Sequence, residues 1–217
     1  MNIVIIGNGG HSKVVKDIIL SNKNFHIVGY LDDKYEDNLI KDNVFYGPIK
    51  AYQFFIDRFD EIKFIIAIGQ NQTRKQIVKK INLEKTLYLS PIHPSAIISP
   101  SARIGKGTVV MANTVINADV VIGDHVIVNT GSIIEHDSIV NDFAHISPNA
   151  TLTGCIQLGE GVHIGAGATL IPNVKVGDWS TIGAGATVIN SIASNITAVG
   201  IPAKSKIVEW CNHAAKN

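Results

Sequence analysis

Several features that would indicate other classes of protein are scarce in this sequence. Only two of the 217 residues are cysteines, Cys155 and Cys211, which are too few for a disulfide framework and show no metal-ligand spacing. Aromatic residues make up 6% of the chain, so aliphatic residues must fill most of the core. Neither sign of charge dominates, because 19 Lys and Arg oppose 18 Asp and Glu. This balance predicts no nucleic-acid partner and no anionic membrane partner.

Long hydrophobic segments are lacking as well. No apolar run approaches the roughly 18 residues that a transmembrane helix needs. The N-terminus has a short apolar run at 3–6, without the basic segment and cleavage site of a signal peptide. We therefore expect a cytoplasmic protein. Apolar residues make up 46% of the chain and charged residues only 17%, which predicts one or two folded domains with a large core.

An aliphatic residue recurs at every sixth position of the second half. The series runs from Ile98 to Val188, and all 16 positions carry Ile, Leu or Val. Four residues after each of them lies a second restricted position, as in Thr108, Ser132 and Ala150. A period of six fits neither an α-helix nor a hairpin meander. It is typical of a parallel β-helix, in which three six-residue faces close one coil and both recurring positions point inward.

The first half alternates predicted strands with predicted helices. Strands are expected at 3–6, 26–33 and 64–69, the first followed by a glycine-rich turn and a helix, the last by a helix at 71–81. This alternation favours a small Rossmann-like α/β domain that binds ligands at the carboxyl ends of its parallel strands. We predict this domain over 1–85, and the β-helix with a C-terminal tail over 86–217. No role is assigned to the tail.

The turn after the first strand is a candidate phosphate site. Backbone N–H groups of Gly9, Gly10 and His11 can hold a phosphate at the start of a helix. The turn resembles the dinucleotide fingerprint, except that Ser12 replaces its third glycine. Such a turn also occurs without any ligand. If it binds one, a nucleotide sugar is favoured over NAD, because the domain has room for only one mononucleotide-binding half.

One outward histidine of the predicted β-helix, His136, stands apart from the others. The six-residue count places four histidines on the outside, where most side chains are merely solvated: His125, His136, His145 and His163. Glu135 and Asp137 flank His136, so that a carboxylate can orient its imidazole. The residue one coil later is Gly154, which leaves space beside the ring and offers an N–H to a developing oxyanion. A base beside such a donor favours acyl transfer.

The same count predicts an outward column of small residues. The column, which suits a thin ligand such as the pantetheine arm of coenzyme A, comprises Pro148, Ala166, Ala184 and Pro202. Small residues also suit a β-helix without any ligand.

The spacing of the histidines argues against a metal site. Hexad-repeat carbonic anhydrases bind zinc with three histidines, two of them five positions apart, and no pair here has that spacing. We therefore predict no metal.

Over nearly its whole length, the chain resembles the bacterial sugar acetyltransferases that are grouped with the sialic acid O-acetyltransferases. It is most similar to the UDP-4-amino-sugar N-acetyltransferases of the PglD type and their relatives in exopolysaccharide clusters. The resemblance lies in the combination of GNGGHSK, YLDD, IGQNQTR, HPSA, NTGSIIEHD, FAHISPNATLTG and VGIPAK. It implies a homotrimer of left-handed β-helices with active sites between subunits, acetyl-CoA as co-substrate and a UDP-linked amino sugar as acceptor.

The resemblance also implies roles for individual residues. His136 would be the general base, Asp137 the acidic residue beside it (often Glu in the family), and Gly154 the oxyanion donor. Positions that contact acetyl-CoA are matched by His145, Ala166 and Ala184. The nucleotide-sugar pocket is matched by Gly9, Gly10, His11, Asp32, Asp33 and Gly69. Because His136 and His145 are half a coil apart, only a neighbouring subunit could bring them into one cleft.

Two alternative functions stay open at this point. One is O-acetylation of a sialic acid or another sugar hydroxyl, since a histidine base serves an amine and a hydroxyl alike. The other is a non-catalytic scaffold whose β-helix only trimerises.

Overall fold

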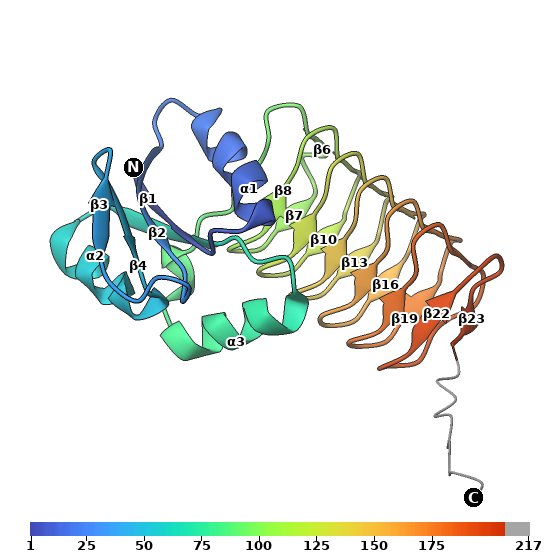
Figure 1. Cartoon of the computed structure of the whole chain (residues 1–217). Coiled ribbons are helices and arrows are strands. Elements are labelled where there is room, and N and C mark those ends of the chain that lie inside the picture. The colour runs from blue at the N-terminus through green and yellow to red at the C-terminus, as the bar shows by residue number, and fades with distance from the viewer. Residues whose placement is uncertain (207–217) are drawn as a thin grey trace, which may run out of the picture.

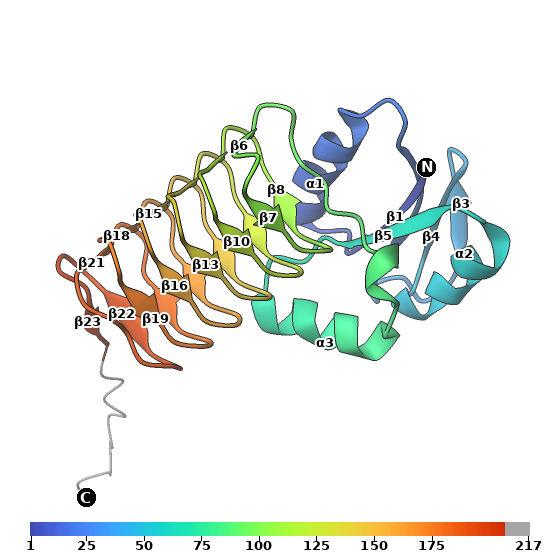
Figure 2. The same ribbon diagram turned by 180° about the vertical axis from the view of Figure 1, so that it is seen from behind.

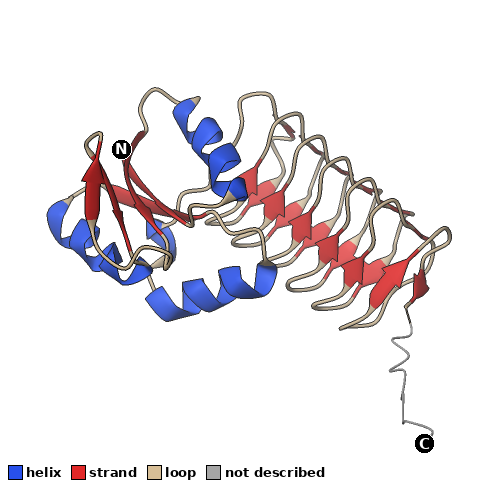
Figure 3. Cartoon of the chain, in the orientation of Figure 1, coloured by secondary structure: helices blue, strands red, loops and turns tan. Residues whose placement is uncertain are grey.

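The computed structural model describes residues 1–206, which form an α/β domain followed by a long β-helix (Figure 1). Residues 207–217, with Cys211 and most of the predicted tail, lie outside the described part. Within residues 1–206, helices occur only in the first half, and the part after residue 96 consists of short strands and turns (Figure 3). None of the helices in 1–206 has the length and apolar character that crossing a membrane requires.

The N-terminal domain is a five-stranded sheet covered by helices on both faces. Its strand order is β3-β4-β2-β1-β5, and only β3 is antiparallel to its neighbour. The elements are β1 (Asn2–Ile6), α1 (Gly10–Leu20), β2 (His26–Leu31), β3 (Leu39–Lys41), β4 (Val44–Gly47), η1 (Ile49–Ala51), α2 (Tyr52–Arg58), β5 (Ile62–Ile66), α3 (Asn71–Ile81) and η2 (Lys85–Leu87). The three predicted strands and both predicted helices are present. The second strand ends at Leu31 rather than at 33, and the third is Ile62–Ile66 rather than 64–69. The β3–β4 hairpin and α2 are additional.

The alternating strand residues explain how the two faces of this sheet are covered. Ile3 and Ile5 pack with α1 on one face, where Val109 of the β-helix joins the same apolar cluster. Val4 and Ile6 pack with α2 and α3 on the other face. Gly7 ends β1 with φ +103°, and a Cβ there would lie 2.9 Å from the Ala67 carbonyl oxygen, so only glycine fits.

The second half is a parallel β-helix with three sheets along its length, whose successive coils are visible from behind in Figure 2. The strands of the first sheet are β8 (Val109–Val110), β11 (Ile127–Val128), β14 (His145–Ile146), β17 (His163–Ile164), β20 (Thr181–Ile182), β22 (Thr197–Val199) and β23 (Lys204–Ser205). Those of the second are β6 (Ile97–Ile98), β9 (Val115–Ile116), β12 (Ile133–Ile134), β15 (Thr151–Leu152), β18 (Thr169–Leu170) and β21 (Thr187–Val188). Those of the third are β7 (Arg103–Ile104), β10 (Val121–Ile122), β13 (Ile139–Val140), β16 (Gln157–Leu158) and β19 (Lys175–Val176).

The predicted coil of three six-residue faces is confirmed by the strand register. Ile134 pairs with Leu152, and Leu152 pairs with Leu170, so each partner lies three faces further along the chain. Every aliphatic position of the series from Val110 to Val188 is at most 2% exposed, so the series forms the core of the β-helix. Burial of this continuous aliphatic column is the main driving force for stacking the coils.

The last coil departs from the predicted register. Ile182 pairs with Ala198, which comes two positions earlier than a full coil would place its partner. The cause is that the chain takes four residues rather than six from Val188 to the next inward position, Ile192. Ala184 therefore comes alongside Gly200, and the predicted place of Pro202 in the column of small residues is wrong.

A buried arginine joins the two halves of the molecule. Arg74 of α3 is 1% exposed and has no carboxylate partner among the described residues. Its guanidinium donates to five backbone carbonyls, those of Ile68, Gly69, His125, Phe143 and Ala144. Nearby, the Asn71 amide donates to the Gly161 carbonyl oxygen at 3.1 Å. The start of α3 is thus fixed to the turns of the β-helix (Figures 1 and 2).

His125 is one place where the expectation of a solvated outward histidine is wrong. It points away from the β-helix core, but the N-terminal domain covers it and leaves it 4% exposed. Its ring stacks on Phe143 at 5.3 Å and meets Tyr88 edge-on at 4.5 Å. Burial lowers its pKa to about 4, so His125 is a neutral part of the interface between the two halves.

Candidate active site

His136 and Asp137 form a hydrogen-bonded pair at the corner that follows β12. The imidazole Nδ1 lies 2.7 Å from Asp137 Oδ2. Both side chains stay more than half exposed, at 57% and 58%. A carboxylate at Nδ1 orients the ring and favours the tautomer whose Nε2 can accept a proton. Asp137 therefore reaches the imidazole despite being one carbon shorter than Glu.

Gly154 lies beside this imidazole, one coil further along. A Cβ on Gly154 would be 2.8 Å from both Nε2 and Cε1 of His136, so any side chain there would displace the imidazole. The carbonyl of His136 accepts a hydrogen bond from Cys155 N at 2.9 Å, which fixes the two coils to each other. Among residues 1–206, the Gly154 N–H has no acceptor. The corner thus combines a base, an open face and a free backbone donor.

His145 lies on a different sheet from the His136 corner. It belongs to β14, where its ring stacks on that of His163 at 4.9 Å and its Nε2 lies 3.1 Å from the Asn129 amide nitrogen. Burial is the main reason that its pKa falls to about 3, and His163 and Arg74 lower it further. His145 is therefore a neutral hydrogen-bonding group near pH 7. A single chain does not bring it to the His136 corner.

A cavity of about 480 Å³ separates His145 from the start of α3. It is lined by Gly69 and Gln70 on one side and by His145, His163 and Trp179 on the other. His11 of α1 is close enough to lower the pKa of His145. Its own pKa falls to about 4 because of burial and Arg74, and its Nε2 is buried with no hydrogen-bond partner in the described part of the chain. Two of the residues predicted for the sugar site, His11 and Gly69, therefore meet the predicted acetyl-CoA residue His145.

The two aspartates predicted for the nucleotide site lie at the carboxyl end of β2. Asp32 Oδ2 accepts the N–H of Asn8, the residue before Gly9, at 2.7 Å. Asp33 Oδ1 accepts the Ile49 N–H at 3.0 Å. Both carboxylates line a cavity of about 370 Å³ that Lys80 also lines. The structure thus brings Asp32 to the glycine turn and places Asp33 in an adjoining hollow.

The glycine turn itself is accessible. A Cβ on Gly9 or Gly10 would meet nothing within 4 Å, so the backbone there can be approached closely. Ser12, which departs from the fingerprint, is 1% exposed and donates its hydroxyl to the Gly9 carbonyl at 2.7 Å. Its hydroxyl is thus used inside the first turn of α1.

Ala166 and Ala184 occupy equivalent corners of successive coils, after β17 and β20. At the glycines that follow them, Gly167 and Gly185, a Cβ would meet no atom of residues 1–206 within 4 Å. The surface between these corners is therefore smooth. Its use by acetyl-CoA stays a prediction.

Sequence reasoning missed Cys155 as a neighbour of His136. Donor atoms of His136, Asp137 and Cys155 all lie within 4.8 Å of one another. The cysteine follows Asp137 by one coil, and this stacking could have been found by the same count that placed Gly154.

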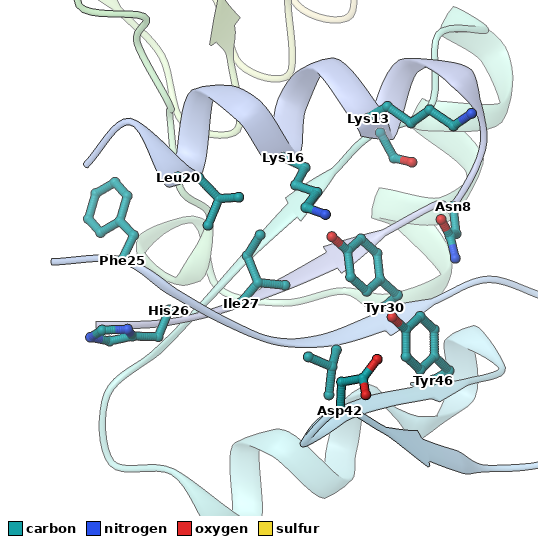
Figure 4. A pocket seen from close by; sticks show the side chains of 12 residues that line it. Asn8, Lys13, Lys16, Leu20, Phe25, His26, Ile27, Tyr30, Asp42 and Tyr46 are labelled. Carbon is teal, nitrogen blue, oxygen red and sulfur yellow. The ribbon is translucent and has the colours of Figure 1, made fainter. Parts of the chain in front are cut away.

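A further cavity of about 540 Å³, also missed, lies in the N-terminal domain between α1 and β2 and β4 (Figure 4). Lys16 and Tyr30 extend into it from opposite walls, and none of the predicted site residues lines it.

Comparison with known proteins covers both halves. Residues 2–81 match the family described as the PglD N-terminal domain. Residues 101–136 and 155–190 match the bacterial transferase hexapeptide family of six repeats. A UDP-N-acetylbacillosamine N-acetyltransferase of Bacillus subtilis is 43% identical over 111 residues, which are 51% of each chain. The match thus spans about half the length of that curated relative.

Solved structures extend the similarity to nearly the whole chain. A perosamine N-acetyltransferase from Caulobacter crescentus, in complex with CoA and GDP-perosamine, has a TM-score of 0.87 at 33% identity, covering 95% of this chain and 97% of the other. The acetyltransferase domain of PglB from Neisseria gonorrhoeae, in complex with acetyl coenzyme A, has a TM-score of 0.81 at 36% identity, covering 94% and 98%. These likenesses confirm the predicted left-handed β-helix with an α/β N-terminal domain.

Proposed function

Because the chain belongs to the nucleotide-sugar N-acetyltransferases that join a PglD-type domain to a hexapeptide β-helix, we propose that it acetylates the amino group of a UDP-linked amino sugar with acetyl-CoA. The product would serve the synthesis of a cell-surface or extracellular polysaccharide. The observation that carries the proposal is the His136–Asp137 pair lying against the bare face of Gly154.

The chemistry follows from that geometry. Nε2 of His136 takes a proton from the sugar amine as the nitrogen attacks the thioester carbonyl carbon. The Gly154 N–H donates to the oxygen of the tetrahedral intermediate. Collapse of the intermediate breaks the C–S bond, and the proton held on His136 passes to the departing CoA sulfur. Asp137 stabilises the imidazolium while it carries that proton.

The acceptor would bind across the N-terminal domain. Backbone N–H groups of Gly9, Gly10 and His11 would contact the phosphates. Asp32 and Asp33 would contact the nucleoside. Gly69 would contact the sugar, which would lie in the 480 Å³ cavity beside the β-helix. A UDP sugar is preferred because the Bacillus subtilis relative is a UDP-sugar enzyme and has the higher identity, whereas the perosamine enzyme is bound to a GDP-linked sugar.

The active unit would be a homotrimer. His136 follows a strand of one sheet and His145 belongs to a strand of another, so a complete site needs His136 of one subunit and His145 of the next. In such a cleft, the pantetheine arm would lie along Ala166 and Ala184. The perosamine enzyme from Caulobacter crescentus was solved with CoA and GDP-perosamine in two variants that replace the same histidine. This is consistent with a histidine that serves the reaction more than binding.

The test is a panel of acceptors assayed for thiol release from acetyl-CoA. UDP-linked amino sugars are expected to give at least tenfold higher kcat/KM than GDP-linked amino sugars, and free sialic acid should give none. Turnover with sialic acid or another sugar hydroxyl alone would favour O-acetylation. Absence of turnover with every nucleotide amino sugar would overturn the proposal.

A further inference from the structure

The base of the candidate active site is also one side of a cluster of metal-binding atoms. One donor atom each from His136, Asp137 and Cys155 lies within 4.8 Å of the other two. Cys155 is one coil beyond Asp137, and its N–H bonds to the His136 carbonyl at 2.9 Å. Gly154, which precedes Cys155, places no side chain between the thiol and the imidazole.

We propose that this cluster binds Zn²⁺ or a similar soft divalent ion, which inhibits the enzyme. Nitrogen, carboxylate oxygen and thiolate sulfur are the three ligand types that Zn²⁺ uses, at about 2.0 to 2.3 Å. Donors on a tetrahedral ion at such distances lie roughly 3.3–3.8 Å apart, so small side-chain rotations close the site. Binding replaces the thiol proton, which passes to solvent, and leaves the fourth position to water.

The geometry explains why such an ion would inhibit. One imidazole nitrogen has a single lone pair, so it cannot bind a metal ion and accept a proton from the sugar amine at the same time. If the ion binds Nδ1, it displaces Asp137 from that atom and lowers the basicity of the ring. The side chains of His136 and Asp137 are more than half exposed and Cys155 is partly exposed, so ions can reach all three. The inhibitory part of the proposal rests on the proposed function, whereas the binding part does not.

Binding is tested with Co²⁺ as a spectroscopic substitute for Zn²⁺ on the full-length protein. Wild-type protein is expected to bind one Co²⁺ per chain and to show the near-ultraviolet charge-transfer band of a thiolate ligand. Cys155→Ser should lose that band and bind at least tenfold more weakly, while Cys211→Ser, the matched control, should keep it. A band that persists in Cys155→Ser, or no band in the wild type, would overturn the site.

Inhibition is tested with Zn²⁺ in the acetyl-transfer assay. Zn²⁺ should inhibit the wild type and Cys211→Ser at a concentration at least tenfold below that needed for Cys155→Ser, and a chelator should restore activity. Equal sensitivity of the two cysteine variants would refute inhibition through this cluster. If no acceptor is turned over, the proposed function fails, but the Co²⁺ band still decides whether the metal site exists.

Discussion

The imidazole of His136 lies on the bare face of Gly154, so closely that a Cβ on the glycine would be 2.8 Å from Nε2. Gly154→Ala should therefore displace the ring from the reacting atoms. A displacement of about 1 Å costs on the order of 100-fold in rate, and we expect that loss in kcat. Thermal stability and CoA affinity, measured in parallel, should change little. Retention of near wild-type kcat would remove Gly154 from the active site.

The carboxylate of Asp137 should matter through its charge, because it accepts from the imidazole whose other nitrogen is the proposed proton acceptor. Asp137→Asn replaces an acceptor by a group that can also donate, which permits the wrong tautomer. We expect kcat to fall by about 10²- to 10⁴-fold with little change in KM. Asp137→Glu, which keeps the carboxylate, should have a kcat within about tenfold of the wild-type value. Equal activity of the Asn and Glu variants would contradict this role.

Arg74 should be worth more to stability than any exposed charge on α3. Arg74→Met leaves the buried carbonyls of His125 and Phe143 without their side-chain donor, and each unsatisfied group costs about 1–3 kcal/mol. The variant also removes the bonds to the partly buried carbonyls of Ile68 and Gly69, whereas the Ala144 carbonyl still accepts from Ile127 N. We expect the free energy of unfolding to fall by at least about 3 kcal/mol in urea titrations. The matched control is Lys75→Ala, which removes a partly exposed ion pair with Glu160 and a cation–π contact with Trp179, and should cost at most about 1–2 kcal/mol. Similar losses in both variants would contradict the role of Arg74.

Stability should fall on acidification because buried histidines resist protonation in the folded chain. The pKa of His125 drops from its ordinary 6.5 to about 4. Between these values the unfolded chain binds a proton that the folded chain does not, so stability is present above pH 6.5 and is lost as the pH falls. For a group this buried, the loss from pH 8 to pH 5 is about 2 kcal/mol.

The contribution of His125 can be isolated with His125→Asn. Asparagine tolerates the left-handed backbone at this position, where φ is +56°, and does not titrate. Denaturant titrations at the two pH values should show a loss in the variant that is smaller by about 2 kcal/mol. An identical loss in variant and wild type would show that His125 does not contribute.

The features that could be predicted from the sequence are those that repeat with the coil, because counting residues along the β-helix gives their positions. The constant length of a coil placed Gly154 beside His136, because each coil repeats the last. The same count placed Pro202 wrongly, because the chain shortens by two residues after Val188. Counting one coil forward from Asp137 would also have shown that Cys155 is its neighbour.

Contacts between the two halves of the molecule could not be found by counting. Nothing in the six-residue pattern indicates that α3 crosses to the β-helix. The pattern therefore did not single out Arg74, and it favoured a solvated side chain at His125. Their burial arises only when the N-terminal domain docks. The domain boundary between 85 and 86 and the roles of the acetyl-CoA residues stay predictions for the same reason.

The most direct test of the central claim is a single-turnover measurement on His136→Asn with acetyl-CoA and a UDP-linked amino sugar. Asparagine has no nitrogen that can take the amine proton, whereas Asp137, Gly154 and both binding regions are unchanged. We predict that CoA and the nucleotide sugar bind with affinities within about threefold of the wild type, while acetyl transfer slows by at least about 10³-fold. Transfer at near wild-type rate in a variant that binds both substrates would show that the proton leaves by another route.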